Sequence, residues 1–406
     1  MSNPAKLPLE GVRVIDLTWV GAGPFTTKIL ADFGAEVIKI ESETRPDQLR
    51  RAEPLKGGGL EQSGYFANRN SNKKSVTLNI KTAEARDTIL RLVEKADVIA
   101  NSFSSGVMER LGLGYREISA RNPNIVYLSM PLTEPEGPYA SYLGYGMNIS
   151  ALVGMTYIAA EPGRYPLGTG TNYPDHLPNP LHAAFAVLSA LRFVKHGGMG
   201  QEIVVPQITS TMSMFPESVL GYANNGKVLE PAGTQSWNAA PHAAYRCAGK
   251  DRWCAISVHD DTEFQALCDT INRKDVASDP RYATAARRRD NAVNLDADIS
   301  LWTESRSAED VQRVLQAAGV RAAVVATAED LVVRDEHLKA RQFWQYLDHP
   351  VMGRTIYHGI PAKFSDTPTQ YRRPAPLLGQ HTDELAELAG IDAQHMAKLK
   401  TAGALR

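Results

Sequence analysis

Short apolar runs alternate with segments of helical periodicity through the first part of the chain. The segment Thr82–Lys95, for example, places Ile89 and Leu92 on one face, as an amphipathic helix does. Strands that alternate with helices are typical of a parallel sheet, so the pattern predicts an α/β fold. The predicted strands are Val12–Leu17, Ala35–Glu41, Ser75–Ile80, Asp97–Asn101 and Ile125–Met130.

A glycine turn follows the first predicted strand and opens a helix that ends near Phe33. Its sequence from Gly21 to Pro24, GAGP, departs from GxGxxG, so it is a weak dinucleotide fingerprint. Glu41 ends the second strand, where an acid either binds a ribose or is a solvated strand end. The polar, glycine-rich segment Arg45–Gly64 is predicted to be a surface loop.

A different pattern begins after Asn225. A hairpin is predicted over Tyr245–Val258, and the late segment Thr355–Ile360 is a further strand candidate. Met212 and Met214 are interpreted as core residues, and the run Arg287–Arg289 as a solvated face. Helices are predicted at Thr209–Asn224, Thr262–Ile271, 273–300, Ala308–Ala317, Thr327–Arg334 and Glu336–Phe343, with a short strand at Ala322–Val325.

The stretch Gly168–Leu191 combines candidate chemistry with a strong helix signal. Its second half is rich in Ala and Leu and predicts a buried helix. Pro178 and Pro180 suit the first turn of that helix, and Asn179 is a candidate N-cap. Asp175 and His176 precede the helix start, where backbone donors can stabilise a negative charge. Asp175 either caps a turn or takes part in catalysis.

The composition excludes several classes of protein. The 406 residues carry a formal net charge of −1, which gives no reason to expect a nucleic-acid partner. The chain has neither an apolar run of membrane-spanning length nor a signal-peptide pattern at its start. The three cysteines, Cys247, Cys254 and Cys268, lack zinc spacing, so we expect no metal. They are interpreted as core or incidental residues in a cytoplasmic protein.

Five motifs occur in order from Leu9 to Leu388 and together resemble one known family. They read LEGVRVIDLTWVGAGP, LADFGAEVIKIE, NKKSVTLNIK, GVMERLGLGY and PAPLLGQHTDELAEL. The chain resembles the class III CoA-transferases of the CaiB/BaiF type, to which formyl-CoA transferase and the related 2-methylacyl-CoA racemases belong.

The resemblance implies a large Rossmann-like domain with a parallel sheet built from both chain ends, and a smaller α+β middle domain. The expected ranges are 1–225 for the first part of the large domain, 226–326 for the small domain, and 327–406 for the linker and the return. The resemblance also implies an interlocked dimer, either a homodimer or a heteromer with a related subunit.

The family's nucleophile is an aspartate ahead of an alanine-rich helix, and the resemblance assigns this role to Asp175 with one extra residue before the helix. Without that gap, His176 would occupy the position. A carboxylate attacks an acyl-CoA thioester to give a mixed anhydride and then an enzyme–CoA thioester, which splits one difficult exchange into easier steps. No permanently bound cofactor is implied, because coenzyme A esters are the substrates.

The resemblance also implies a set of substrate or CoA contacts. Gly21 stands where transferases have a glutamine, and the family's basic residue after IKIE is Ser42 here. Arg and Lys side chains suit the phosphates of CoA, although Lys81 and Arg110 are equally compatible with plain solvent exposure. The implied contact residues are Gly21, Ala22, Leu78, Lys81, Ser102, Phe103, Arg110 and His176.

Three functions are compared. A racemase needs a His–Asp pair that the chain replaces with Tyr145 and Gly146, which makes proton abstraction at this position unfavourable. A mainly structural subunit of a heteromeric CoA-transferase is the second alternative. The favoured function is CoA transfer from an acyl-CoA, expected to be succinyl-CoA, to a dicarboxylate or aryl-succinate, as in the benzylsuccinate branch. Arg164, Tyr173 and His176 are candidates for holding a distal carboxylate.

Overall fold

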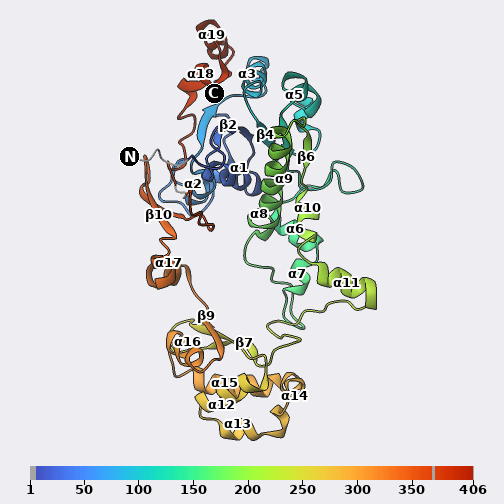
Figure 1. The fold of residues 1–406 in the computed structure, drawn as a ribbon, viewed down its shortest axis with the longest axis vertical. Helices are drawn as coiled ribbons and strands as arrows, with labels where there is room; N and C mark the ends of the chain where they lie inside the picture. The colour runs from blue at the N-terminus through green and yellow to red at the C-terminus, as the bar shows by residue number, and fades with distance from the viewer. Residues whose placement is uncertain (1–5, 368–370, 406) are drawn as a thin grey trace. The chain divides into compact units, whose positions relative to one another are not determined.

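The computed structural model describes residues 6–367 and 371–405 (Figure 1). Contacts within the chain divide it into two compact units. The first contains Met1–Met155, Gly168–Val228 and His337–Arg406, and the second contains Thr156–Leu167 and Leu229–Glu336. These units are defined by contacts within a single chain. The domain ranges expected from the sequence refer to domains of an interlocked dimer, so they stay a prediction.

The first unit contains a parallel sheet of six strands in the order β3-β2-β1-β4-β5-β6. This order is that of the doubly wound dinucleotide-binding folds, in which ligands bind beyond the carboxyl ends of the strands. The predicted α/β class is confirmed, and each of the five strands predicted above begins and ends within three residues of its predicted bounds. The strands are β1 Arg13–Leu17, β2 Glu36–Glu41, β3 Lys74–Thr77, β4 Val98–Asn101, β5 Val126–Ser129 and β6 Glu202–Val204.

Alternate residues of each strand face opposite layers of helices, as the period of a strand requires. Ile15 packs in a cluster with Ile89 of α3, whereas its neighbour Val14 packs in a second cluster with Leu30 of α1 and Val187 of α9, which spans Pro178–Lys195. Six α-helices of this unit precede the second unit in the sequence, among the residues that the structure describes. They are α1 Ala22–Asp32, α2 Gly64–Asn70, α3 Ala83–Val93, α4 Val107–Arg110, α5 Tyr115–Arg121 and α6 Gly146–Leu152.

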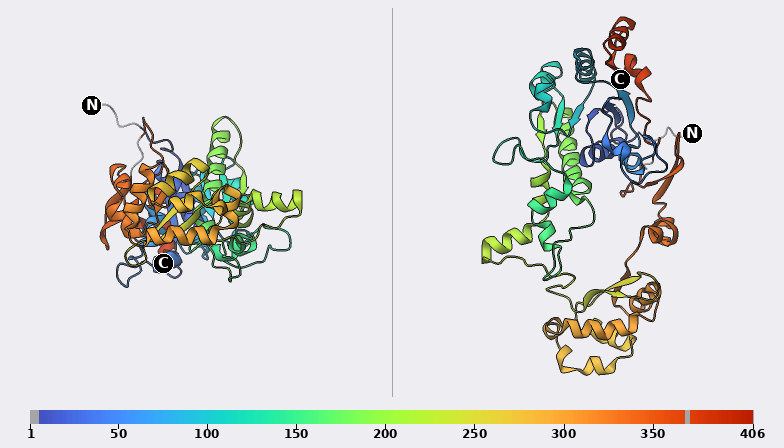
Figure 2. Two further views of the ribbon diagram at one scale, coloured as in Figure 1. Left: turned by 90° about the horizontal axis from the view of Figure 1, so that it is seen from below. Right: turned by 180° about the vertical axis from the view of Figure 1, so that it is seen from behind.

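The C-terminal segment joins the first unit without adding a strand to the six-stranded sheet. It forms a separate antiparallel hairpin, β10 Trp344–His349 with β11 Gly353–His358. Its last helices, α18 Leu385–Ala389 and α19 Ala393–Thr401, pack beside α3 (Figures 1 and 2). Among the residues that the structure describes, β11 pairs only with its hairpin partner β10, so the expectation that both chain ends build the parallel sheet is wrong.

The second unit contains a three-stranded antiparallel sheet, β7-β8-β9, covered by helices. The predicted hairpin is β7 with β8, and Cys247, Cys254 and Cys268 are buried and free, as the sequence predicts for core residues. Its elements are β7 His242–Arg246, β8 Trp253–Ser257, α12 Asp261–Thr270, α13 Lys274–Ser278, α14 Ala285–Asp290, α15 Ala292–Thr303, α16 Ala308–Ala317 and β9 Arg321–Val324. The helices α7 Met155–Ile158 and α17 Glu336–Ala340 lie where the units join in sequence.

Several predictions about single residues or segments are wrong. Met212 and Met214 are 47% and 41% exposed, and the predicted helix around them is two helices, α10 Gln207–Met212 and α11 Pro216–Asn225. Arg288 is buried, because its guanidinium donates to the backbone oxygens of Ala240 and Tyr282. Glu41 is buried and ion-paired with Arg50, which comes from the segment predicted to be a surface loop, so Glu41 is not a solvated strand end. Because Glu41 lines the cavity described below, the ribose-binding alternative stays a prediction.

The helix after Asp175 is α9, Pro178–Lys195, and it begins earlier than predicted. Pro178 and Pro180 occupy its first turn, where a missing N–H costs no hydrogen bond. Asn179 is not the N-cap. Its buried side chain instead donates to the carbonyl of Val205 and to the hydroxyl of Ser210, both at 3.0 Å. No helix in the described ranges is both long and apolar enough to cross a bilayer.

Candidate active site

Asp175 lies in the short helix α8, Tyr173–His176, directly before α9. Its N–H donates to the carbonyl of Asn172 at 2.9 Å, which fixes the turn, and the residue is only 6% exposed. A buried carboxylate needs a compensating partner, because removal from water penalises its charged form.

The partner of Asp175 is Gln207, the first residue of α10. Its Nε2 donates to Oδ1 of Asp175 at 2.6 Å. Burial nevertheless dominates and raises the pKa of Asp175 to about 6, while the Gln207 hydrogen bond and the charge of Arg69 act in the opposite direction. The carboxylate is therefore ionised at neutral pH but less stabilised than one exposed to water.

Two glycines border the other oxygen of this carboxylate. A methyl group added at Gly146 would lie 2.8 Å from Oδ2 of Asp175, and one added at Gly21 would lie 2.8 Å from Cβ and 3.1 Å from Oδ2. A Cβ atom is essentially never found this close to another heavy atom. Positions 21 and 146 therefore require glycine as long as the Asp175 side chain keeps its observed position. The glutamine expected at position 21 by the resemblance has no room in this chain.

His176 points toward a different set of side chains. Its Nδ1 lies 2.8 Å from Nη2 of Arg69, and its Nε2 lies 3.5 Å from the hydroxyl of Tyr65. Burial and the charge of Arg69 lower the pKa of His176 to about 4, so the ring is neutral at pH 7 and its Nδ1 can accept from Arg69. Arg69 also lies over the ring of Phe25, with its Cζ 4.2 Å from the ring centre.

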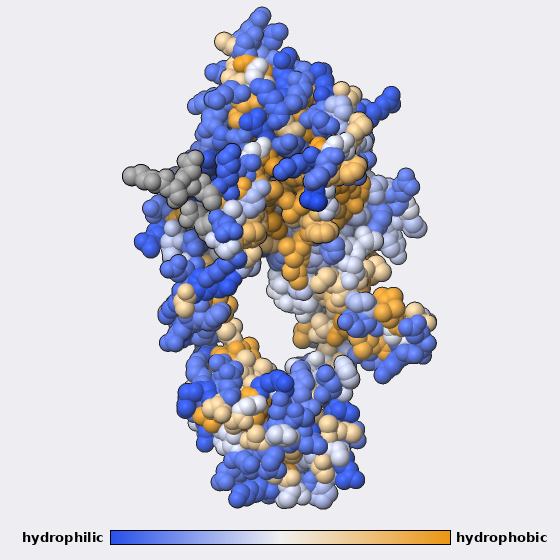
Figure 3. Space-filling view, viewed as in Figure 1, coloured by the Kyte–Doolittle hydropathy of each residue, from blue (hydrophilic) through white to orange (hydrophobic). Residues whose placement is uncertain are grey.

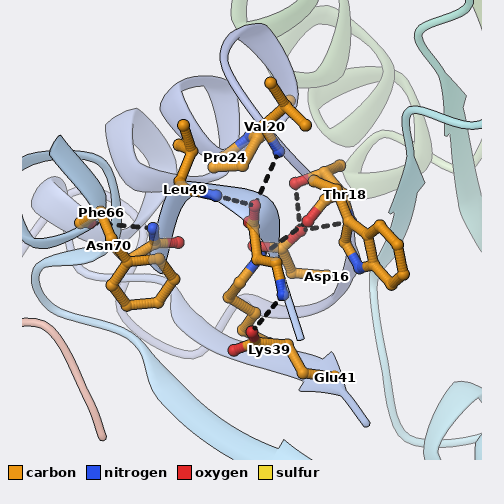
Figure 4. Close-up of polar contacts among 12 residues, drawn as sticks. Asp16, Thr18, Val20, Pro24, Lys39, Glu41, Leu49, Phe66 and Asn70 are labelled. Atoms are coloured by element: carbon orange, nitrogen blue, oxygen red, sulfur yellow. Dashed lines mark hydrogen bonds and ion pairs between the residues drawn. The ribbon is translucent and has the colours of Figure 1, made fainter. Parts of the chain in front are cut away.

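The loop between β1 and α1 presents Gly21 to Asp175. Buried charges hold this loop in place (Figure 4). Val20 adopts a φ of +66°, which is strained for a β-branched residue. Its N–H donates to Oδ1 of Asp47 at 3.1 Å, and Lys39 donates to the carbonyl of Thr18 at 2.7 Å. Lys39 and Asp47 form a fully buried ion pair of 3.0 Å, which ties the loop to β2.

A cavity of about 610 Å³ opens beyond the carboxyl ends of β1, β2 and β4. Among the residues named by the sequence analysis, Leu78, Lys81 and Phe103 line it. Trp19 and Phe103 pack edge to face with their ring centres 5.7 Å apart. Such a pocket, apolar with a few charged groups at its rim, suits a nucleotide-sized ligand.

The remaining predicted contacts are not among the residues that line this cavity. Ser102 uses its hydroxyl to hold Trp19, accepting from its N–H at 2.9 Å. Arg110 is exposed at the end of α4, one residue before the lining residue Leu111. Ala22 is the first residue of α1 and is buried. Arg45 was missed by the sequence analysis, although it lines the cavity and its Cζ lies 5.2 Å from the Trp19 ring centre.

The three residues that the sequence analysis suggested for holding a distal carboxylate do not all lie in the same unit of the chain. Arg164 belongs to the second unit, where it is exposed and pairs with Glu161 at 3.1 Å. Tyr173 and His176 belong to α8, beside Asp175. Sequence reasoning missed Gln207, Arg69 and Tyr65, because their contacts with this loop span 32, 107 and 111 residues along the chain.

Comparison with known proteins decides the family. The family model "CoA-transferase family III" matches residues 9–382, nearly the whole chain. The chain belongs to CoA-transferase family III. The family expected from the five sequence motifs is therefore confirmed, and with it the expectation that the protein is a CoA-transferase.

Similar proteins include two from Chloroflexus aurantiacus. The succinyl-CoA–D-citramalate CoA-transferase is 31% identical over 97% of this chain and 97% of its own length. The alpha subunit of a succinyl-CoA–L-malate CoA-transferase is 31% identical over 99% of this chain and 94% of its own length. Among solved structures, a CaiB/BaiF family protein from Brucella suis has a TM-score of 0.87 and 29% identity, over 94% of this chain and all of that one.

Proposed function

We propose that this family III CoA-transferase moves CoA from succinyl-CoA to a second dicarboxylic acid, with Asp175 as the nucleophile. The observation that carries the proposal is the buried Asp175 carboxylate, held at one oxygen by Gln207 and bordered at the other by two glycines. The similar D-citramalate and L-malate enzymes, both named for succinyl-CoA, support the choice of donor.

The proposed chemistry begins with attack of the ionised Asp175 on the thioester carbonyl carbon. A carbon–oxygen bond forms, the carbon–sulfur bond breaks, and CoA leaves as the thiolate. The thiolate then attacks Cγ of Asp175, which gives an enzyme–CoA thioester and releases succinate. The acceptor acid repeats the two steps in reverse, so the carboxylate is regenerated and no net proton is consumed.

Binding of the CoA portion is proposed for the 610 Å³ cavity. Lys81 and Arg45 provide positive charge for phosphates, and Arg45 supplies it three residues after Ser42, where the family resemblance expects a basic residue. Trp19 and Phe103 offer aromatic surface beside them. Trp19 lies two residues before Gly21, so one short loop would connect the CoA pocket with the nucleophile.

The acceptor's distal carboxylate is proposed to bind at Arg69, with His176 and Tyr65. Arg69 is a half-buried cation that makes no direct ion pair with the described residues, and its Nε has no hydrogen-bond partner among them. The charge of Asp175 acts on Arg69 without a direct contact, so a substrate carboxylate could still bind the guanidinium directly. Neutral His176 adds no positive charge of its own and leaves that role to Arg69.

The same geometry argues against a racemase. Tyr145 is 59% exposed, and Gly146 lies against Asp175, so neither supplies a base at the two positions where a racemase needs its His–Asp pair. Asp175 itself argues against a purely structural subunit, because burying an ionisable carboxylate without function would only lower stability.

A second copy of this chain is the proposed partner. Leu181, Phe185 and Leu188 repeat along one face of α9 and are 47%, 74% and 40% exposed. Hydrophobic side chains gather over this helix in Figure 3. Apolar helix faces of this kind mark protein interfaces. A homodimer is favoured over a heteromer, because the chain carries its own nucleophile; its interlocking stays a prediction.

The test is to incubate the purified protein with succinyl-CoA and a panel of acids, namely benzylsuccinate, mesaconate, citramalate and oxalate, and to identify acyl-CoA products by mass. We expect a new acyl-CoA with at least one dicarboxylate and none with Asp175→Ala. Arg69→Met should reduce kcat/KM for the dicarboxylate by more than tenfold, while Arg164→Met, which removes the same charge from an exposed arginine, should leave it unchanged.

Two outcomes would contradict the proposal. Epimerisation of a 2-methylacyl-CoA without transfer would identify a racemase. Turnover by a folded Asp175→Ala protein, or hydroxylamine trapping that labels His176, would show that Asp175 is not the nucleophile.

A further inference from the structure

Gln207 and Asp175 are held in a fixed relation by neighbouring elements. The N–H of Gln207 donates to the carbonyl of Pro131, just beyond β5, at 3.0 Å. From the first turn of α9, Asn179 donates to Val205 and Ser210, on either side of Gln207. The helix that follows Asp175 is thereby tied to the segment that carries Gln207, so the 2.6 Å hydrogen bond joins two anchored groups.

The two oxygens of Asp175 consequently have different surroundings. Oδ1 accepts from the carboxamide of Gln207, whereas Oδ2 faces the space that Gly21 and Gly146 leave by having no side chains. We propose that Gln207 positions Asp175 for attack through Oδ2 and then serves as the oxyanion donor at Oδ1. This inference rests on the proposed function and concerns a residue that the family resemblance does not assign.

The second role follows from the balance of the reaction. When Oδ2 bonds to the acyl carbon, Oδ1 becomes the carbonyl oxygen of Asp175. Attack of the CoA thiolate on Cγ forms a carbon–sulfur bond and moves the carbonyl electron pair onto Oδ1. The Cγ–Oδ2 bond then breaks, and Oδ2 leaves with the released carboxylate. Gln207 already donates to the atom on which the negative charge develops, as an oxyanion hole requires.

A carboxamide suits this task better than a charged side chain would. An arginine or lysine at position 207 would stabilise the resting carboxylate by a full charge and make it a weaker nucleophile. The amide of Gln207 is a neutral donor, so it orients Asp175 while burial still dominates the carboxylate's environment. The same donor serves the resting carboxylate and the later oxyanion.

The first experiment measures Gln207→Leu in the half-reaction without an acceptor acid. Protein is mixed with succinyl-CoA, quenched at increasing times, and analysed by mass for CoA attached to Asp175. We expect the rate of adduct formation to fall roughly 100- to 1000-fold, the loss typical of an oxyanion-hole donor, with the KM for succinyl-CoA within twofold of wild type. Gln201→Leu is the matched control, because Gln201 is exposed on the same segment, and its rate should be unchanged.

The second experiment does not depend on turnover. The Asp175 carboxyl is titrated by NMR in protein labelled with ¹³C at aspartate, and its signal is assigned by its absence in Asp175→Asn. In Gln207→Leu the pKa of Asp175 should rise above that of wild type, because one hydrogen bond to the charged form is lost. Gln207→Glu keeps the side-chain shape and should raise it further by adding a like charge.

The outcomes separate the two proposals. A wild-type protein that forms no CoA adduct on Asp175 would refute the proposed function, whereas the titration would still report on Gln207. An unchanged half-reaction and an unchanged pKa in a folded Gln207→Leu protein would overturn the role of Gln207 while leaving the proposed function intact. If Gln207→Leu does not fold, the same readings are taken on Gln207→Glu.

Discussion

At the scale of single residues, burial decides the chemistry of Asp175. Its carboxylate has one hydrogen-bond donor side chain and an arginine nearby, yet removal from water outweighs both and raises its pKa to about 6. A raised pKa brings the nucleophile close to the pH at which enzymes usually work, so small changes in the surroundings alter its ionised fraction.

The first prediction concerns the pH dependence of transfer. Only ionised Asp175 can attack, so kcat/KM for succinyl-CoA should fall tenfold per pH unit below about 6 and level off above pH 7. Initial rates between pH 4.5 and 8.5 provide the measurement, with circular dichroism at each pH to confirm folding. A profile without an acid limb above pH 5 would contradict the assignment.

The second prediction concerns stability. Because the folded state raises this pKa from 3.8 to about 6, the folded protein binds the proton more tightly than the unfolded chain, and stability is lost as pH rises through this range. Asp175→Asn removes that loss. Urea unfolding should show the variant more stable than wild type by about 2–3 kcal/mol at pH 8, with a smaller difference at pH 4.5. If Asp175→Asn is less stable than wild type at pH 8, the folded protein compensates the negative charge of Asp175, which would contradict this prediction.

The third prediction concerns the glycine beside the nucleophile. Gly146→Ala would place a methyl group 2.8 Å from Oδ2 of Asp175 and should reduce kcat by at least 100-fold by displacing the attacking oxygen. Gly58→Ala is the control, since a methyl group there meets nothing within 4 Å and φ is not positive. Both variants are compared by steady-state kinetics and by thermal unfolding. Equal activity in both would show that Oδ2 does not need this space.

At the scale of elements, the strands and the first helices could be predicted because local apolar periodicity determines them. The contacts that build the site could not. Glu41 ends a predictable strand, but its burial depends on Arg50, which lies in a polar segment that composition describes as a loop. Gln207 and Asp175 are 32 residues apart in the sequence, which is longer than any local sequence pattern, so their hydrogen bond could not be predicted from such a pattern. The residues of a buried polar pair are of the same types as those of a solvated surface. The sequence alone therefore does not tell a buried pair from an exposed one, and the fold is needed to distinguish them.

The fourth prediction concerns the loop that carries Val20. Asp47→Ala removes the acceptor of the Val20 N–H and the buried partner of Lys39, which should destabilise the protein by about 3 kcal/mol. Because Trp19 lines the cavity, the KM for acyl-CoA should rise as well. Asp87→Ala removes an exposed pair with Arg91 and should cost less than about 1 kcal/mol. Urea unfolding and acyl-CoA titrations measure both variants, and equal losses would exclude a special role for Asp47.

At the scale of the whole molecule, the proposed dimer would connect assembly with catalysis through the exposed face of α9. The helix begins three residues after Asp175, and its buried residues Ala183 and Val187 pack on the central sheet. Its opposite face leaves Leu181, Phe185 and Leu188 exposed. A second copy on that face would bury these side chains and would brace the helix from which Asn179 supports the Gln207 segment.

The last prediction follows from that arrangement. Phe185→Glu places a charge at the most exposed apolar position of the three, which is 74% exposed, and should convert a dimer into a chain of 44.4 kDa as measured by light scattering. Transfer activity should fall with the dimer content of the Phe185→Glu protein, whereas an interlocked wild-type dimer should keep both its mass and its activity on dilution. Leu301→Glu introduces the same charge at a side chain that is 71% exposed in the second unit and should keep the wild-type mass. A wild-type protein that is monomeric and fully active would show that α9 needs no partner, and the apolar face would then require another explanation.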